Sequence, residues 1–147
     1  MRDAGAALAG CIQDRRHYLA VRVYFEDTDF SGLVYHASYL RFCERGRSDF
    51  LRLAGVHHHE LAQDGQAFAV RRMEIDFRKG ARIDDVLTVE TALEQLGGAS
   101  VDLAQKIWRG EELLLAAEVK AALIGPDRRP ARLPQIMRAR LAGYLPG

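Results

Sequence analysis

A change of hydrophobic period within residues 21–53 most constrains how this chain can fold. Apolar and polar residues alternate at its start, which predicts a half-buried β-strand over about residues 18–26. Apolar residues then recur every three or four positions, which predicts a helix over about residues 37–54 with one buried stripe. Gly46 falls on that stripe, so we expect the helix to pass close to a sheet, and Gly55 is suited to end it.

A polar bend at residues 27–32 separates the predicted strand from the predicted helix. It contains two carboxylates, Asp27 and Asp29, and Gly32 relaxes the limits on the backbone where the chain turns. The first N–H groups of a helix lack intrahelical partners and the helix dipole is positive there, so an oxygen that gains negative charge is stabilised beside them. The bend is therefore a candidate catalytic site, although an aspartate in such a bend is also a common turn or capping residue.

The remaining sequence predicts an antiparallel sheet. From residue 68 to residue 124 the alternation predicts four strands, joined mainly by short turns such as residues 97–98 and 109–111, and the last strand ends before residues 125–126. One strand, one long helix and four further strands pack most compactly as an α+β fold, in which the sheet wraps around the helix. The expected organisation is an N-terminal extension (1–17), one domain (18–134) and a C-terminal tail (135–147).

Length, charge and cysteine content narrow the class of protein. The chain has 147 residues, enough for one domain with a sizeable core; 48% are hydrophobic and the net charge is +1, so neither disorder nor general nucleic-acid binding is indicated. Cys11 and Cys43 do not make a disulfide framework, which favours reduced thiols in the cytoplasm. Residues 8–11 resemble a bacterial lipoprotein cleavage box. The apolar run before them is short, and Asp3 places an acidic residue in the flanking region that is basic in a signal sequence. We therefore expect no stable membrane insertion.

Two segments have a composition that could bind a ligand, but each also has a simpler interpretation. Residues 57–60 read His-His-His-Glu, but consecutive side chains do not easily converge on one ion, so we expect solvated histidines in a loop and no metal site. Residues 128–147 contain five arginines and no acidic residue. This composition suits either a surface for phosphates or an acidic partner, or a solvated basic tail with a short helix over about residues 135–141.

The run from Tyr24 to Tyr39 carries a family resemblance; it reads YFEDTDFSGLVYHASY. It resembles the signature of hotdog-fold acyl-CoA thioesterases of the 4-hydroxybenzoyl-CoA thioesterase type, and it is most similar to the branch encoded beside the bacterial Tol-Pal genes. The resemblance continues through residues 42–47 and, more loosely, 75–85, so it spans about residues 18–134. It implies a hotdog fold, with an antiparallel sheet of about five strands around one long helix. It also implies a homodimer or homotetramer with the active site between subunits.

The resemblance assigns roles to residues of the bend. The second aspartate of the Asp-x-Asp pair is the catalytic carboxylate in that family, and this position is Asp29, acting as nucleophile or general base. His36 opens the helix, where the backbone N–H polarises the thioester carbonyl; a capping or packing role is the alternative. Tyr35 and Tyr39 would line the acyl pocket or the dimer interface, or simply pack. We expect Asp27 to hold the bend by hydrogen bonding to the backbone.

A thioesterase of this type implies an acyl-CoA substrate and no further cofactor or metal. Basic residues on the rim would then meet the coenzyme A phosphates. The candidates are Arg78, Lys79 and Arg82 near one strand end, together with Arg128 and Arg129.

Two alternatives belong to other functional classes. One is a non-catalytic adaptor that binds acyl carrier protein or a Tol-Pal-related partner through the basic C-terminal segment. The other is a hotdog lyase, a dehydratase that would use a histidine with an acidic partner. The sequence contains no G-x-S-x-G elbow, P-loop or dinucleotide-binding G-x-G-x-x-G, and Cys43 lies on the apolar helix stripe, poorly placed for a nucleophile.

Overall fold

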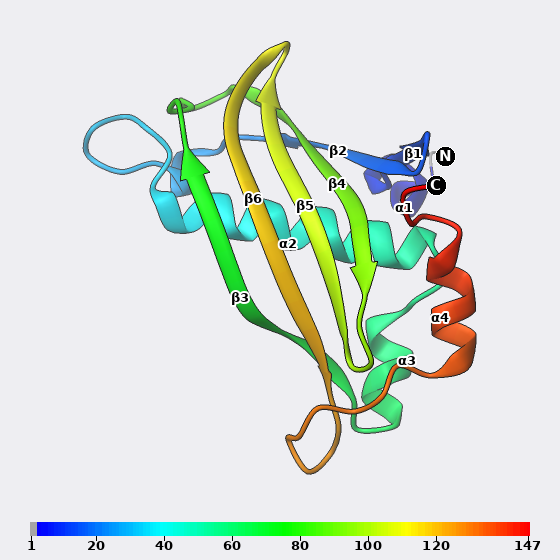
Figure 1. The fold of residues 1–147 in the computed structure, drawn as a ribbon. Helices are drawn as coiled ribbons and strands as arrows, with labels where there is room; N and C mark the ends of the chain where they lie inside the picture. Colours follow the sequence, from blue (N-terminus) through cyan, green and yellow to red (C-terminus); the bar gives the residue numbers. More distant parts are fainter. Residues whose placement is uncertain (1–2) are drawn as a thin grey trace.

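The computed structural model describes residues 3–147, which form one curved antiparallel sheet and four helices (Figure 1). The strands are β1 (Cys11–Gln13), β2 (Arg16–Arg22), β3 (Ala67–Phe77), β4 (Val86–Leu96), β5 (Ser100–Arg109) and β6 (Glu112–Ile124). The helices are α1 (Ala4–Leu8), α2 (His36–Leu53), α3 (His58–Gln63) and α4 (Gln135–Ala142), and η1 (Phe25–Asp27) is a 3-10 turn. The strand order is β1-β2-β4-β5-β6-β3, with every neighbouring pair antiparallel. The predicted α+β arrangement is confirmed, with the short β1 as a sixth strand.

The core lies between the sheet and α2, which crosses behind the strands in Figure 1. Phe42, Cys43 and Phe50 of α2 are fully buried. Gly46 lies where helix and sheet come closest: a Cβ atom there would be 2.7 Å from Cγ1 of Val89 on β4. The predicted close approach of the helix to the sheet is therefore confirmed.

The boundaries of α2 agree closely with its sequence pattern. The helix was expected over residues 37–54 and covers His36–Leu53. Gly55 follows the C-cap residue Ala54 with φ of +91°, a conformation that favours glycine. The predicted role of Gly55 at the helix end is confirmed.

β2 differs from the predicted strand over residues 18–26 at both ends. It covers Arg16–Arg22, after which the chain turns through η1, where Phe25 is 81% exposed. Asp27 is buried, and its carboxylate accepts a hydrogen bond from the backbone N–H of Tyr24 at 2.8 Å. This bond turns the chain back although apolar and polar residues continue to alternate. The prediction that the strand extends to residue 26 is therefore wrong. The expected bend-holding role of Asp27 is confirmed.

The N-terminal segment contains regular structure. Residues 1–2 lie outside the described residues, and the rest of the expected extension at residues 1–17 contains α1, β1 and the start of β2. His17 is fully buried, and its Nε2 lies 2.6 Å from Oδ2 of Asp49 on α2. The same carboxylate oxygen accepts the N–H of Gly10 at 2.8 Å. Contacts between residues distant in sequence therefore hold the N-terminal segment on the domain.

The histidine-rich segment forms a short helix instead of the expected loop. His58–Gln63 make up α3, which is fixed by the buried side chain of Leu61, while His58 and His59 remain exposed. Across residues 3–147, no group of three or more His, Cys, Asp and Glu side chains is arranged to hold a metal ion.

The C-terminal segment also packs against the domain. The short helix predicted over residues 135–141 is confirmed as α4, but Met137 and Leu141 are buried in the core. Arg138 donates to a carbonyl of the β4–β5 turn at 2.8 Å, and Arg140 donates to the carbonyl of the glycine that ends α2 at 2.6 Å. The interpretation of this segment as a solvated tail is therefore wrong.

Within residues 3–147, no helix combines the length and the apolar character needed to cross a membrane.

Candidate active site

The bend between η1 and α2, residues 27–35, forms a closed loop that we call the site loop. It projects beyond the sheet at the left of Figure 1. Thr28 and Val34 form an antiparallel bridge across it, and the N–H of Asp29 donates to the carbonyl of Leu33 at 3.0 Å. Gly32 adopts φ of +81° at the reversal, which a residue with a side chain would adopt only under strain. The site loop is thus held by its own backbone bonds.

Asp29 presents an exposed carboxylate on the site loop. Its Oδ1 accepts two hydrogen bonds from Ser31, one from the hydroxyl at 2.5 Å and one from the backbone N–H at 2.8 Å. These bonds, the hydroxyl bond first, lower the pKa of Asp29 below its ordinary value of 3.8, and the nearby His36 lowers it further. No hydrogen bond within residues 3–147 uses Oδ2 of Asp29, so an ionised oxygen is free at neutral pH.

The N-terminus of α2 follows the site loop directly. Tyr35 is the N-cap residue, and its N–H donates to the carbonyl of Asp27 at 2.9 Å. In the described part of the chain no side chain caps α2, so the N–H groups of His36 and Ala37 are unpaired within the helix. The His36 ring stacks on Tyr35 at 5.2 Å between centroids and lies 5.9 Å from the ring of Phe77 at the end of β3. Unpaired donors and the positive end of the helix dipole therefore lie directly after the site loop.

A second loop, residues 79–85, supports the site loop, and we call it the support loop. The N–H of Val34 donates to the carbonyl of Ala81 at 2.9 Å, and Leu33 forms a bridge with Arg82. The N–H of Ala81 donates to the hydroxyl of Tyr39 at 2.8 Å, and both residues are buried. Burial raises the pKa of Tyr39. Tyr39 therefore joins α2 to the support loop, a contact that the sequence reasoning did not include.

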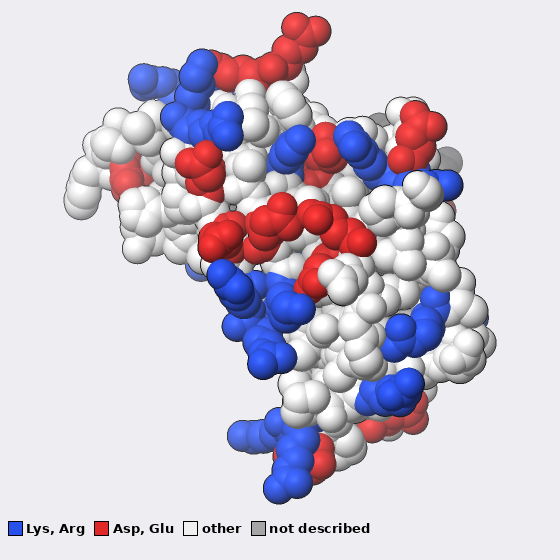
Figure 2. Space-filling model, in the orientation of Figure 1, with Lys and Arg blue, Asp and Glu red and all other residues white. Residues whose placement is uncertain are grey.

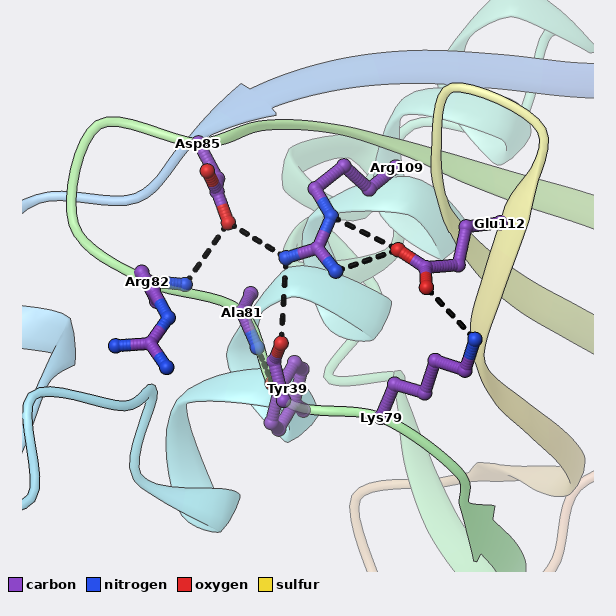
Figure 3. A network of polar contacts seen from close by, with 8 residues as sticks. Tyr39, Lys79, Ala81, Arg82, Asp85, Arg109 and Glu112 are labelled. Carbon is purple, nitrogen blue, oxygen red and sulfur yellow. Dashed lines mark hydrogen bonds and ion pairs between the residues drawn. The ribbon is translucent and has the colours of Figure 1, made fainter.

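Figure 3 shows how charged side chains fix the support loop. Arg109 at the end of β5 donates from Nη1 to Asp85 at 2.9 Å and from Nε to Glu112 at 3.1 Å. Asp85 also accepts the N–H of Arg82 at 2.9 Å, and Glu112 accepts a bond from Lys79 at 2.8 Å. The backbone bond from Arg82, then the bond from Arg109, lowers the pKa of Asp85. The sequence reasoning missed this network, because only the loose similarity at residues 75–85 pointed toward it.

The basic residues expected to meet phosphates lie in two places. Arg78 directly precedes the support loop and Lys79 and Arg82 belong to it, at the same end of the sheet as the site loop. Arg78 is paired with an aspartate of β3 at 2.9 Å and Lys79 with the first glutamate of β6 at 2.8 Å, whereas Arg82 makes no ion pair with any of residues 3–147. Arg128 and Arg129 follow the far end of β6, so one subunit does not bring them to the site loop.

A band of carboxylates crosses the middle of the sheet face that is turned away from α2, with basic side chains beside it (Figure 2). Burial, then the hydrogen bond and charge of Glu94, raises the pKa of Glu118 to about 7. This cluster lies on the opposite face of the sheet from α2. Its groove is lined by Arg72, Glu74, Glu94, Gln95, Asp102, Glu118, Val119 and Lys120.

Comparison with known proteins identifies the class to which this arrangement belongs. The model of the thioesterase superfamily matches residues 31–116. The chain is 39% identical to an acyl-CoA thioesterase YbgC of Haemophilus influenzae, covering 81% of this chain and 89% of the relative. It is 41% identical to an acyl-CoA thioester hydrolase YbgC of Escherichia coli, covering 78% and 87%. A probable thioesterase of Bartonella henselae superposes with a TM-score of 0.78 at 47% identity, covering 81% of this chain and 99% of that structure.

Fold and matches together define a thioester hydrolase of the hotdog fold, as the resemblance implied. The chain belongs to the thioesterase superfamily.

Proposed function

We propose that the chain hydrolyses acyl-CoA thioesters, with Asp29 as the catalytic carboxylate. One observation carries the proposal: an ionised carboxylate with a free oxygen lies on the loop that leads into the uncapped N-terminus of α2. A thioester carbonyl placed between them would gain negative charge on its oxygen as the carbon is attacked. The N–H groups of His36 and Ala37, which no side chain of residues 3–147 caps, would stabilise that charge. The names of the relatives support coenzyme A as the thiol carrier.

Asp29 can act as the nucleophile or as a general base, and in the nucleophilic route it attacks the thioester carbonyl directly. In this route Oδ2 bonds to the carbonyl carbon, the carbon–sulfur bond breaks, and its electron pair leaves with the coenzyme A thiolate. Water then cleaves the mixed anhydride to a carboxylic acid and restores Asp29, and a proton from water restores the thiol. In the alternative route Asp29 activates the water directly and the products are the same. Neither route uses a metal or a cofactor.

A second copy of the chain is proposed to cover the site. Asp29 and Phe30 are exposed, and Tyr35 and Phe77 expose half of their surface. β3 is the last strand of the sheet, so an eleven-residue strand edge beside the site lacks a neighbour within residues 3–147. Such edges favour pairing with another chain. A homodimer or homotetramer would cover the exposed residues of the site, and Arg128 would approach a substrate only through such an assembly.

Other parts of the assignment rest on chemistry. Of the three basic candidates at the site-loop end of the sheet, Arg78 and Lys79 are paired, whereas Arg82 makes no ion pair with any of residues 3–147, so it is our first choice for a coenzyme A phosphate. Cys11 and Cys43 are free thiols, which suits a reducing compartment, and we propose the cytoplasm. Acyl carrier protein is an alternative thiol carrier, and association with Tol-Pal proteins remains a proposal from the resemblance.

The experiment is thiol release from short, long and aromatic acyl-CoAs, with the products identified by mass spectrometry. Hydrolysis predicts equal amounts of free coenzyme A and carboxylic acid from at least one substrate. The nearness of His36 to Asp29 is the one feature that favours a lyase. An enoyl thioester without free thiol would establish that reaction, and binding without any product would favour the adaptor.

A further inference from the structure

Arg47 is a buried cation that forms no ion pair among the residues that the structure describes. It lies on α2 with 9% of its surface exposed, and its Nη1 donates to Oε1 of Gln105 on β5 at 3.1 Å. None of the ion pairs formed within residues 3–147 includes Arg47. Burial lowers the pKa of Arg47, but a guanidinium remains charged at neutral pH. An unpaired buried charge is costly, so its retention in the core needs a reason.

Gln105 does not neutralise that charge. Its amide nitrogen is used elsewhere, donating at 2.9 Å both to the carbonyl of Cys43 and to the hydroxyl of Thr91. The network therefore orients Arg47 with one neutral acceptor, whereas a guanidinium has five N–H donors. Within residues 3–147 the fully buried side-chain atoms without a partner belong to His17 and Asp102. The other nitrogens of Arg47 therefore keep some contact with solvent.

Arg47 lines a cavity of about 230 Å³ between α2 and the sheet. Aliphatic and aromatic side chains from α2, β3, β5 and β6 form most of its wall. Glu44 and His58 also line it at its exposed rim. The charge of Glu44 raises the pKa of Arg47 and so offsets part of the effect of burial, but Glu44 forms no ion pair with Arg47. The apolar wall consists of Leu51, Phe68, Val70, Val101, Leu103 and Ala121.

From this geometry we propose that the cavity binds a small carboxylic acid as its anion. The carboxylate would accept charge-assisted hydrogen bonds from Arg47, and the apolar body would lie against the wall. A dry cavity of about 150 Å³ holds benzene, so this one accommodates a substituted ring or a short branched chain. Arg47 lies eleven residues beyond His36 on the helix, roughly 16 Å along its axis, so the cavity is distinct from the Asp29 site.

The ligand class has a direct connection to the reaction. Hydrolysis of a thioester releases a carboxylic acid, so the cavity would hold a molecule of the product class. That connection rests on the proposed function. The binding itself follows from Arg47 and the cavity alone, and it is measured without any acyl-CoA.

The test is calorimetric titration of the full chain with benzoate, and with benzamide as an uncharged probe of the same shape. We expect benzoate to bind with a heat that Arg47→Met weakens roughly tenfold or more in Kd, the range expected on losing a charge-assisted bond. Arg41→Met is the matched control, because Arg41 is exposed on the same helix and does not line the cavity; its Kd should be unchanged.

Two further variants keep the result interpretable. Ala121→Leu fills the cavity from the sheet and leaves Arg47 in place, so it should abolish binding even if Arg47→Met fails to fold. Asp29→Asn should bind benzoate like the wild type, whether or not the chain hydrolyses thioesters. The proposal is overturned if the wild type does not bind benzoate, if benzamide binds equally well, or if Ala121→Leu binds unchanged.

Discussion

Removing one oxygen atom, by Tyr39→Phe, should weaken both the fold and the active site. The Tyr39 hydroxyl accepts the N–H of Ala81 at 2.8 Å, in a place where Tyr39 is 4% exposed and Ala81 is fully buried. Phenylalanine keeps the ring packing and leaves a buried N–H without an acceptor, which costs about 1–3 kcal/mol. For a chain of this length a loss of about 2 kcal/mol lowers Tm by roughly 4–8 °C.

The same substitution should reduce the rate of catalysis. The carbonyl of Ala81 accepts the N–H of Val34, so movement of Ala81 is transmitted to the site loop and to the start of α2. Small errors in placement of reacting groups are costly, and we expect kcat to fall about tenfold with little change in KM.

Urea unfolding and thiol release would measure the two effects. Tyr35→Phe is the control for stability, because Tyr35 is half exposed and no hydrogen bond from its hydroxyl is formed within residues 3–147. An unchanged unfolding midpoint for Tyr39→Phe would refute the reasoning.

Two further predictions concern stability. The pKa of Glu118, about 7, lies above its ordinary 4.5, so the folded protein binds more protons between these values and its stability falls as the pH rises through them. Because Glu118 is exposed, solvent screening limits this loss of stability to about 1 kcal/mol. The urea midpoint of the wild type should therefore differ between pH 5 and pH 8, and Glu118→Gln should reduce that difference. The same difference in both proteins would contradict this prediction. Gly46→Val should destabilise by about 2 kcal/mol, because a Cβ would lie 2.7 Å from Val89. Ala37→Val on the same helix is the control, and equal midpoints for the two variants would argue against the close approach.

Local sequence patterns predicted the elements on which the site is built. Gly46 is a glycine for a steric reason and Gly55 for a conformational one. Asp27 is a turn residue whose carboxylate accepts a hydrogen bond from a residue three positions earlier. The roles of Gly55 and Asp27 depend on residues near them in the chain, so local composition was sufficient. Gly46 contacts Val89 on β4, but its place on the apolar stripe of the helix was enough to predict a close approach to the sheet. Asp29 was singled out by the bend, and its proposed role was supplied by the family resemblance.

Contacts between distant segments could not be predicted in this way. His17 was assigned to an extension because nothing nearby indicates that it meets Asp49, 32 residues away. The bond from Tyr39 to the support loop spans 42 residues, and that from Arg109 to Asp85 spans 24. Each depends on how the sheet wraps around α2, which the hydrophobic period does not specify in detail.

The catalytic assignment predicts how the free oxygen of Asp29 affects turnover. Asp29→Asn retains an acceptor for the Ser31 bonds and removes the ionised oxygen, so the site loop should keep its conformation. Glu111→Gln is the control, since Glu111 is an exposed carboxylate in the β5–β6 turn.

The measurement that tests this most directly is kcat for thiol release by wild type, Asp29→Asn and Glu111→Gln on the best acyl-CoA substrate. The account predicts a loss of at least about 10³-fold in Asp29→Asn, wild-type turnover in Glu111→Gln and similar Tm values for all three. Equal turnover in the wild type and Asp29→Asn would contradict it.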